Sequence, residues 1–351
     1  MLLLLAIISV LLLISVVLSL VRNDFWVFRM LEYPRLQKLF IIVGVFGFWI
    51  IYWPEQNRFY QFLAAALLVS IVYLLYKILP YTVLYKKEMK RVPQGDARNE
   101  IKIFAANVYQ DNKAYNKMLE QIKSCDPDLI FLLETDNGWA QGVAELGASY
   151  PHQLLEPIDN TYGLLFYSRF PLKNAAVKYL VKGDIPSIEA TAVLPSGQEV
   201  HMWGLHPEPP VPGENRYATA KNKELMKVAL KVEECQTPCI VFGDLNDVAW
   251  SHTTELFRKT SRLLDPRRGR GFYSTFSAHH WFIRFPLDYI FCSEHFGLIN
   301  MKRLPKNGSD HFATFTHLAF KAGLAAVQEA PKADRDEVEE AKEMATQKVK
   351  E

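Results

Sequence analysis

The sequence has little cysteine and little net charge. Its 351 residues include four cysteines, Cys125, Cys235, Cys239 and Cys292, whose spacings match neither a metal site nor a redox motif. We therefore expect free, largely buried thiols. Basic and acidic residues nearly balance, at 40 and 38, and they are equal in number within residues 98–321. This balance argues against the broad basic face that typically binds duplex nucleic acid.

Charge is missing altogether from three stretches near the amino terminus, Leu2–Val21, Leu39–Trp53 and Phe59–Tyr76. The first and third are long enough to span a bilayer, and the second ends in aromatic residues of the interfacial kind. A cleaved signal peptide is the alternative for the first run, but that run has no basic start, has no small-residue cleavage site and is too long. We expect residues 1–80 to form a membrane anchor of about three transmembrane helices.

The charges that flank these runs predict an orientation. Residues 22–38 carry four basic side chains and residues 77–91 carry five, whereas the turn after the second run carries only Glu55 and Arg58. Three spans place both basic segments on one side, which the positive-inside rule makes the cytoplasm. We therefore expect a multi-pass protein of the inner (cytoplasmic) membrane with a cytoplasmic catalytic domain. Residues 81–97 are predicted to be a basic juxtamembrane linker that can rest on anionic lipid.

Residues 98–321 are predicted to form one soluble domain, because short apolar runs recur there with helical patterns between some of them. Many strands without strict strand–helix alternation predict an α/β domain with more than one sheet. The tail, residues 322–351, is rich in Ala, Glu and Lys, and we expect it to be disordered or loosely helical. The predicted strands are 100–108, 128–134, 162–168, 187–194, 199–205, 238–243, 287–293 and 311–320, and the predicted helices are 115–125 and 214–235.

The most informative stretch is Pro238–Asp247, in which a buried strand is interrupted by Gly243. Asp244 and Asn246 follow at alternate positions, so their side chains point the same way. A carboxylate beside an amide can hold a metal, a water and a phosphate oxygen. The alternative is a simple Asp/Asn turn.

Other polar residues also stand at the ends of apolar runs. Taken singly, each has a structural interpretation as a helix cap, a turn, a packed histidine or a salt-bridged strand residue. Together they predict a site at the strand ends, where open α/β sheets bind their ligands. These residues are Asn107, Glu134, His206, Asp288, Ser309, Asp310 and His311.

In this order the residues resemble the endonuclease/exonuclease/phosphatase superfamily. The stretches Gly243–Asn246 and Ser309–His311, with Asp288 between them, are specific to that group, and His206–Pro210 with Trp250-Ser251 is similar to its membrane-anchored bacterial members. The resemblance covers residues 98–321. It implies a DNase I-like four-layer sandwich, with two packed mixed β-sheets flanked by helices and preceded by the transmembrane helices.

The resemblance further implies hydrolysis of a phosphate ester by metal-assisted attack of water. Glu134 would bind the ion, with Asn107 and Asp310 completing or orienting the site. Mg²⁺ is the expected ion, with Mn²⁺ as the alternative, because oxygen ligands suit a hard cation. Tyr109 stands where some nucleases of the group have an acidic residue. Whether the site would bind one metal ion or two is therefore open.

The remaining residues would carry the catalytic roles. Asp244 would orient or deprotonate the attacking water, with Asn246 fixing that water and a phosphate oxygen. His311, held by Asp288, would act as the base or as a cation on the developing charge. His206 would hydrogen-bond a phosphate or leaving oxygen. The sequence leaves open which of Asp244 and His311 takes the proton.

Two classes of substrate are possible at this point: a lipid or small-molecule phosphate ester, and a nucleic acid. Attachment to a bilayer favours a lipid, because it raises the local concentration. A nuclease acting on DNA or RNA needs electrostatic grip, for which Arg267, Arg268 and Arg270 are the substrate-binding candidates. An inactive membrane scaffold on the same fold is the third alternative.

Overall fold

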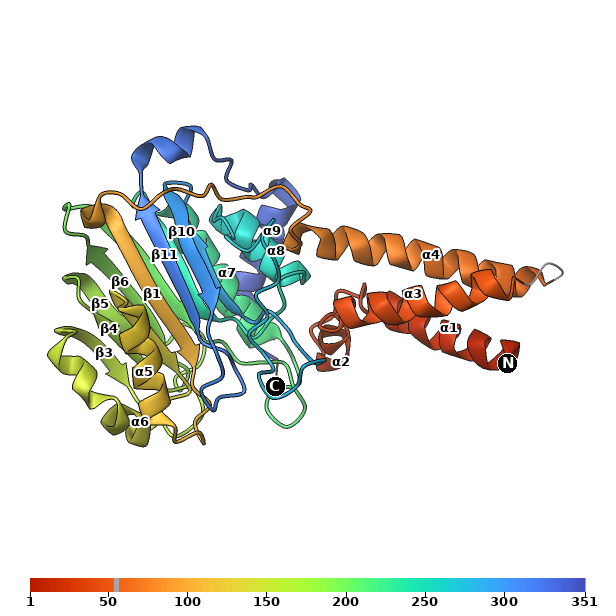
Figure 1. Ribbon diagram of the computed structural model, residues 1–351, viewed down its shortest axis with the longest axis horizontal. Helices are drawn as coiled ribbons and strands as arrows, with labels where there is room; N and C mark the ends of the chain where they lie inside the picture. The colour runs from red at the N-terminus through yellow and green to blue at the C-terminus, as the bar shows by residue number, and fades with distance from the viewer. Residues whose placement is uncertain (54–56, 351) are drawn as a thin grey trace.

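The protein consists of a helical stalk and a β-sandwich domain (Figure 1). The structure, a computed structural model, describes residues 1–53 and 57–350. Glu55, one of the charges used to predict the orientation, lies outside the described residues.

Every predicted strand is present, and β3, β5 and β10 occur in addition. The three extra strands are partly exposed, which weakens the apolar pattern by which a strand is recognised. The strands are β1 (Glu100–Asn107), β2 (Leu129–Leu133), β3 (His152–Glu156), β4 (Leu164–Ser168), β5 (Leu172–Lys178), β6 (Ser187–Val193), β7 (Glu199–Leu205), β8 (Cys239–Asp244), β9 (Asp288–Cys292), β10 (Phe296–Arg303) and β11 (Thr314–Phe320).

The strands form two mixed sheets that pack face to face. One has the order β10-β11-β1-β2-β4-β3 and the other β5-β6-β7-β8-β9. Strand β1 is parallel to β2 and β7 is parallel to β8, while β11 and β9 run antiparallel to β1 and β8. Aromatic rings fill the space between the sheets, with the centroid of Phe242 lying 5.2 Å from that of Phe131 and 6.1 Å from that of Phe166.

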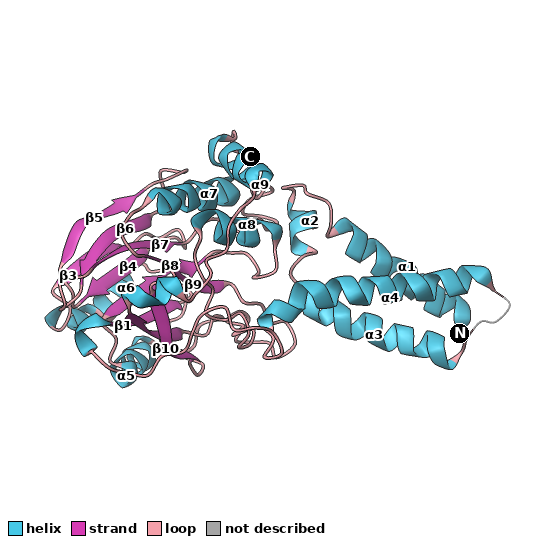
Figure 2. Ribbon diagram, turned by 90° about the horizontal axis from the view of Figure 1, so that it is seen from above, coloured by secondary structure: helices cyan, strands magenta, loops and turns pink. Residues whose placement is uncertain are grey.

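Helices cover both outer faces of the sandwich, which confirms the predicted α/β fold with flanking helices (Figure 2). Helices α5 and α6 pack on the first sheet, α7 and α8 pack on the second, and α9 packs on α7 and α8. These helices are α5 (Tyr115–Cys125), α6 (Asn137–Gly142), α7 (Thr219–Glu234), α8 (His252–Ser261) and α9 (Arg335–Thr346), with short 3₁₀ turns at Leu79–Tyr81, Ala97–Asn99, Ala144–Ala148 and Ala322–Ala326.

The stalk contains a helix in each of the three uncharged runs, α1 (Leu2–Leu18), α3 (Arg35–Ile51) and α4 (Arg58–Ile78), with the short α2 (Trp26–Met30) beside the domain. The three long helices pack together around Trp49, whose indole donates a 2.9 Å hydrogen bond to Ser9. Among the described residues, only Arg58–Tyr81 is long and apolar enough to cross a membrane, and the other two helices are shorter. The structure therefore has a helix in each uncharged run, but only one of the three is long and apolar enough to cross a membrane, which does not support the predicted set of about three transmembrane helices.

The linker and the tail both lie against the sandwich domain. The linker runs along the domain, where the Val92 amide donates to Leu298 over 3.0 Å. The tail forms α9, which packs on α7 and buries Ala341 and Ala345. Of the two predicted alternatives, a disordered or a loosely helical tail, the structure has a helix at Arg335–Thr346. Small alanines allow close helix contact there without large apolar side chains. The four cysteines are free, as expected, and two of them are buried.

Candidate active site

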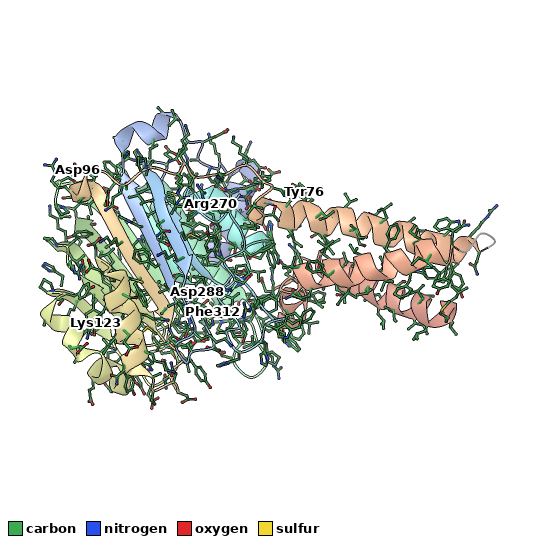
Figure 3. All side chains as sticks on the ribbon, in the orientation of Figure 1. Tyr76, Asp96, Lys123, Arg270, Asp288 and Phe312 are labelled. Carbon is green, nitrogen blue, oxygen red and sulfur yellow. The ribbon has the colours of Figure 1, made fainter. Side chains whose placement is uncertain are left out.

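The predicted catalytic and metal residues meet at one edge of the sandwich. Strands β1, β2, β7 and β8 end at this edge, and their antiparallel neighbours β9 and β11 begin there. Each strand therefore delivers one polar group to the same place. Asp288 and Phe312, the residue after His311, mark this edge in Figure 3. The residues brought together are Asn107, Glu134, His206, Asp244, Asn246, Asp288, Asp310 and His311.

Two carboxylates hold the imidazole of His311. Asp288 and Asp244 face each other across the β8–β9 pair. The ring Nδ1 lies 2.9 Å from Asp288 Oδ2 and Nε2 lies 3.6 Å from Asp244 Oδ2. Burial alone would lower the pKa of His311, but the two carboxylates outweigh it and raise this pKa to about 10. His311 is therefore a buried cation at neutral pH.

Asn107 links this cluster to a third carboxylate, that of Glu134. Its amide nitrogen donates to Glu134 Oε1 over 2.6 Å and to Asp244 Oδ2 over 3.2 Å. Burial raises the pKa of Glu134 to about 7. Glu134 has no ion pair with a basic side chain anywhere in 1–53 or 57–350. A buried carboxylate without a counter-charge is costly, so a bound cation would stabilise this position.

The loop before β11 fixes the remaining acid and the histidine. Ser309 Oγ donates to the backbone oxygen of Asn107 over 2.8 Å and accepts the His311 amide over 2.9 Å. Asp310 is half-buried beside it, and its charge raises the pKa of both Glu134 and His311. Ser309 thus ties this loop to the end of β1.

Asn246 and His206 line the other side of the site. The Asn246 amide nitrogen donates to Pro207 O, and its backbone N–H donates to Asp244 Oδ1, each over 2.9 Å. Burial, together with the charge on His311, lowers the pKa of His206 to about 3. His206 is therefore neutral, and its Nδ1 has no hydrogen-bond partner in the described part of the chain. This nitrogen is enclosed by the protein, so it is an unsatisfied polar atom in the wall of the site.

A divalent cation fits the Glu134 side of the cluster better than the His311 side. Ligand atoms of Asp244, Asp288 and His311 lie within 4.8 Å of one another, but a protonated imidazole donates hydrogen bonds and repels a cation. Glu134, Asn107 and Asp310 instead offer oxygen atoms, which Mg²⁺ prefers. Glu134, Asn107 and Asp310 therefore stay the candidate residues for a bound cation.

The three predicted substrate-binding arginines do not join the site. Arg267 is only 2% exposed, pairs with Asp265 over 2.8 Å and lies under the Tyr289 ring. Arg268 pairs with Glu88 over 2.6 Å, and Arg270 is directed to backbone oxygens. These arginines therefore do not form a free basic patch. Arg267 pairs with an acid two residues away, and Arg268 pairs with an acid that is distant in sequence.

Sequence reasoning missed a set of residues behind Asn246. The Tyr33 hydroxyl, from the stalk, donates to the backbone oxygen of Asn246 over 2.7 Å. Next to it, Lys221 forms a buried ion pair with Asp247 over 2.6 Å. Asp247 adjoins the Gly243–Asn246 motif and could have been suspected from that position. Nothing in the sequence pairs Tyr33 or Lys221 with this loop.

Comparison with known proteins agrees with this geometry. The model of the endonuclease/exonuclease/phosphatase family matches residues 104–311. No curated protein sequence matches the chain.

Solved structures similar to the chain share its fold. The human Nocturnin catalytic domain is 20% identical, with a TM-score of 0.51, and the match covers 65% of this chain and 97% of that one. A family protein from Bacteroides thetaiotaomicron is 16% identical, with a TM-score of 0.52 and coverage of 63% and 98%. One from Beutenbergia cavernae is 15% identical, with a TM-score of 0.51 and coverage of 64% and 72%.

Proposed function

The chain belongs to the endonuclease/exonuclease/phosphatase family of metal-dependent hydrolases that act on ester bonds, and from this premise we propose that it is a membrane-anchored, Mg²⁺-dependent phosphoesterase. The reaction is hydrolysis of a phosphate ester by water. The observation that carries the proposal is the charged His311, held between Asp288 and Asp244 and joined through Asn107 to Glu134.

The protonation states support a division of roles between the two candidate bases. His311 already carries its proton at neutral pH, so it serves as a cation on the developing phosphoryl charge, with Asp288 holding its ring. Asp244 is then the group that orients the water and accepts its proton. A divalent ion bound by Glu134, Asn107 and Asp310 would supply Lewis-acid polarisation of a phosphoryl oxygen.

The neutral histidine completes the binding of phosphate. His206 is uncharged, and the N–H of its imidazole ring would donate to a phosphate or leaving-group oxygen. Asn246 fixes the opposite wall through its bond to Pro207. Both side chains thus orient substrate without adding charge.

The stalk supports the membrane part of the proposal. Its helices expose large apolar side chains along their length, including Phe40 at 66%, Phe62 at 67% and Val69 at 69%. The amino terminus lies at the far end of the stalk, whereas residues 22–38 and the segment after α4 lie at the domain end (Figure 1). If the stalk crosses the bilayer, both basic segments are on the domain side, which the positive-inside rule makes the cytoplasm.

The experiment is hydrolysis of bis-p-nitrophenyl phosphate by the full chain in detergent, with Mg²⁺ or EDTA. Asp244→Asn should lower kcat by at least about 10³-fold, as expected for loss of a catalytic group. Asp336→Asn, an exposed carboxylate on α9, is the matched control. Full activity in folded Asp244→Asn, or in EDTA, would overturn the mechanism.

Extraction of the native membranes with alkaline carbonate tests the anchor, because a spanning protein stays in the pellet.

Nuclease activity is the competing function. Its main support in the sequence was the arginine cluster. The arginines that would grip a nucleic-acid backbone are occupied or turned away. Plasmid DNA in the same assay tests this alternative, and metal-dependent nicking that requires Asp244 would restore it.

A further inference from the structure

A cavity of about 700 Å³ lies where the stalk meets the domain. Leu36 and Phe40 at the start of α3 form one wall, and the segments 270–274 and 281–284 form the others. The cavity adjoins the active site, because Phe312, which follows His311, lies under the arginines of its wall. The ring of Phe276, from the same loop as the wall residue Trp281, lies 5.0 Å from the His311 ring.

The polar wall of the cavity has an excess of positive charge. Arg284 and Arg303 place their guanidinium carbons 5.1 Å and 4.3 Å from the centroid of the Phe312 ring, and Arg270 lines the same space. None of the three forms an ion pair with a carboxylate within the described ranges. Burial and the charge of Arg284 lower the pKa of Arg303. Like charges held together without an acid favour an anionic ligand.

The opposite wall is apolar and continues onto the stalk. Phe40 is 66% exposed, and the same helix carries further exposed apolar side chains toward the far end. Trp281 is 83% exposed at the rim of the cavity, and the Gln37 amide donates to Phe282 O over 2.9 Å, which joins α3 to this loop. A ligand that fills the cavity therefore meets charge on one side and an apolar helix surface on the other.

We propose that this cavity binds an anionic phospholipid, with the phosphate headgroup on Arg284 and Arg303 and the acyl chains along α3. The site rests on the proposed membrane anchoring, since the lipid comes from the bilayer that surrounds the stalk. Free phosphate would pair with the arginines but would leave the apolar wall without a contact. A zwitterionic lipid would cover the apolar wall but would not neutralise the excess positive charge of the arginines. Bound here, the headgroup lies beside the His311 loop, which favours a lipid phosphoester as the substrate class.

The test is calorimetric titration of the full chain in detergent, in EDTA so that no turnover occurs. The probes are dioctanoyl phosphatidylglycerol, dioctanoyl phosphatidylcholine and inorganic phosphate. We expect phosphatidylglycerol to bind at least tenfold more tightly than either of the others. Arg284→Gln/Arg303→Gln should weaken this binding at least tenfold. The control Arg98→Gln/Arg335→Gln changes two exposed arginines away from the cavity and should leave binding unchanged.

Trp281→Ala provides a second variant in case the arginine pair is needed for folding, because so exposed a side chain contributes little to the core. It should weaken phosphatidylglycerol binding without changing the unfolding temperature. Equal binding of the two lipids, binding of inorganic phosphate as tight as that of phosphatidylglycerol, or unchanged binding in a folded variant would overturn the proposal.

Hydrolysis of bis-p-nitrophenyl phosphate by the same preparations separates the two proposals. Mg²⁺-dependent hydrolysis without selective lipid binding contradicts the lipid site alone. Selective lipid binding without hydrolysis contradicts the proposed activity alone.

Discussion

Tyr33 and Asn246 lie 213 residues apart in sequence and are joined by a hydrogen bond from the Tyr33 hydroxyl to the Asn246 backbone oxygen. Burial and the nearby Asp247 raise the pKa of Tyr33 well above its ordinary value, so the hydroxyl remains a donor. The stalk segment between α1 and α3 therefore supports the loop that carries Asn246. The stalk is part of the framework of the active site as well as a candidate anchor.

Replacing Tyr33 by phenylalanine should lower kcat about two- to tenfold, since one hydrogen bond contributes about 0.5–1.5 kcal/mol. KM should change less, because the bond positions the loop and does not touch the substrate. Tyr76→Phe is the control, as that ring is 73% exposed on α4. A lower unfolding temperature with unchanged kcat would limit Tyr33 to a structural role.

Replacing Asp288 by asparagine should lower kcat by about 10³–10⁴-fold, the scale of loss for a carboxylate that orients a catalytic histidine. It should also change the pH profile. The pKa of His311 is about 10 with both carboxylates present, so activity that needs the cation is lost only as pH rises through that value. In Asp288→Asn this loss should move to lower pH. An unchanged alkaline limb would contradict the role assigned to Asp288.

The candidate site residues stand at strand ends in the sequence, and the structure brings those ends together at one edge of the sandwich. Asn107, Glu134, Asp244 and His311 each end or precede a strongly apolar strand, and strand order alone brings such ends together. Their hydrogen bonds could then be anticipated from residue type. Recognising polar residues at the ends of apolar strands was therefore enough to group these side chains.

Reasoning from the sequence failed for the arginines, whose acidic partners lie both near them in sequence and far along the chain. Arg267 and Arg268 were predicted to be free for substrate, yet Asp265, Glu88 and Glu255 neutralise them. Composition shows that acids exist but does not show which arginine each one faces.

The tail helix had a signal that composition hid. Asp334 and Glu337 form a capping box, which is readable from sequence. Ala341 and Ala345, one turn apart, form the stripe that packs on α7. A low content of large apolar residues excludes an independent fold, but it does not exclude docking on an existing one.

Lys221 and Asp247 form a buried ion pair behind the active-site loop, and breaking it should be strongly destabilising. Lys221→Met leaves an unpaired buried carboxylate, which costs about 3–5 kcal/mol. At about 2–4 °C per kcal/mol for a domain of this size, the unfolding temperature should fall by about 6–20 °C. Lys221→Met/Asp247→Asn removes both charges and should recover part of the loss. A double variant no more stable than the single one would show that packing of the lysine stem, and not charge pairing, dominates.

Mg²⁺ should stabilise the folded protein, and this effect should disappear in acid. At 100 times Kd, ligand binding contributes about 2.7 kcal/mol, or about 5–10 °C in unfolding temperature. The pKa of Glu134 is about 7 in the folded protein. At pH 8.5 this carboxylate is free to bind the ion, whereas at pH 5.5 a proton competes with it. Thermal unfolding in Mg²⁺ and in EDTA at both pH values measures the difference.

Glu134→Gln separates metal binding from the titration of this group. Because the folded pKa of Glu134 is raised, the metal-free protein loses stability as pH rises from about 4.5 through about 7, where the buried carboxyl must ionise. The glutamine does not ionise, so in EDTA at pH 8.5 the variant should be more stable than the wild type. It should also lose the Mg²⁺ effect. A Mg²⁺ shift of equal size in Glu134→Gln would place the ion elsewhere, with the Asp244–Asp288–His311 cluster as the remaining candidate.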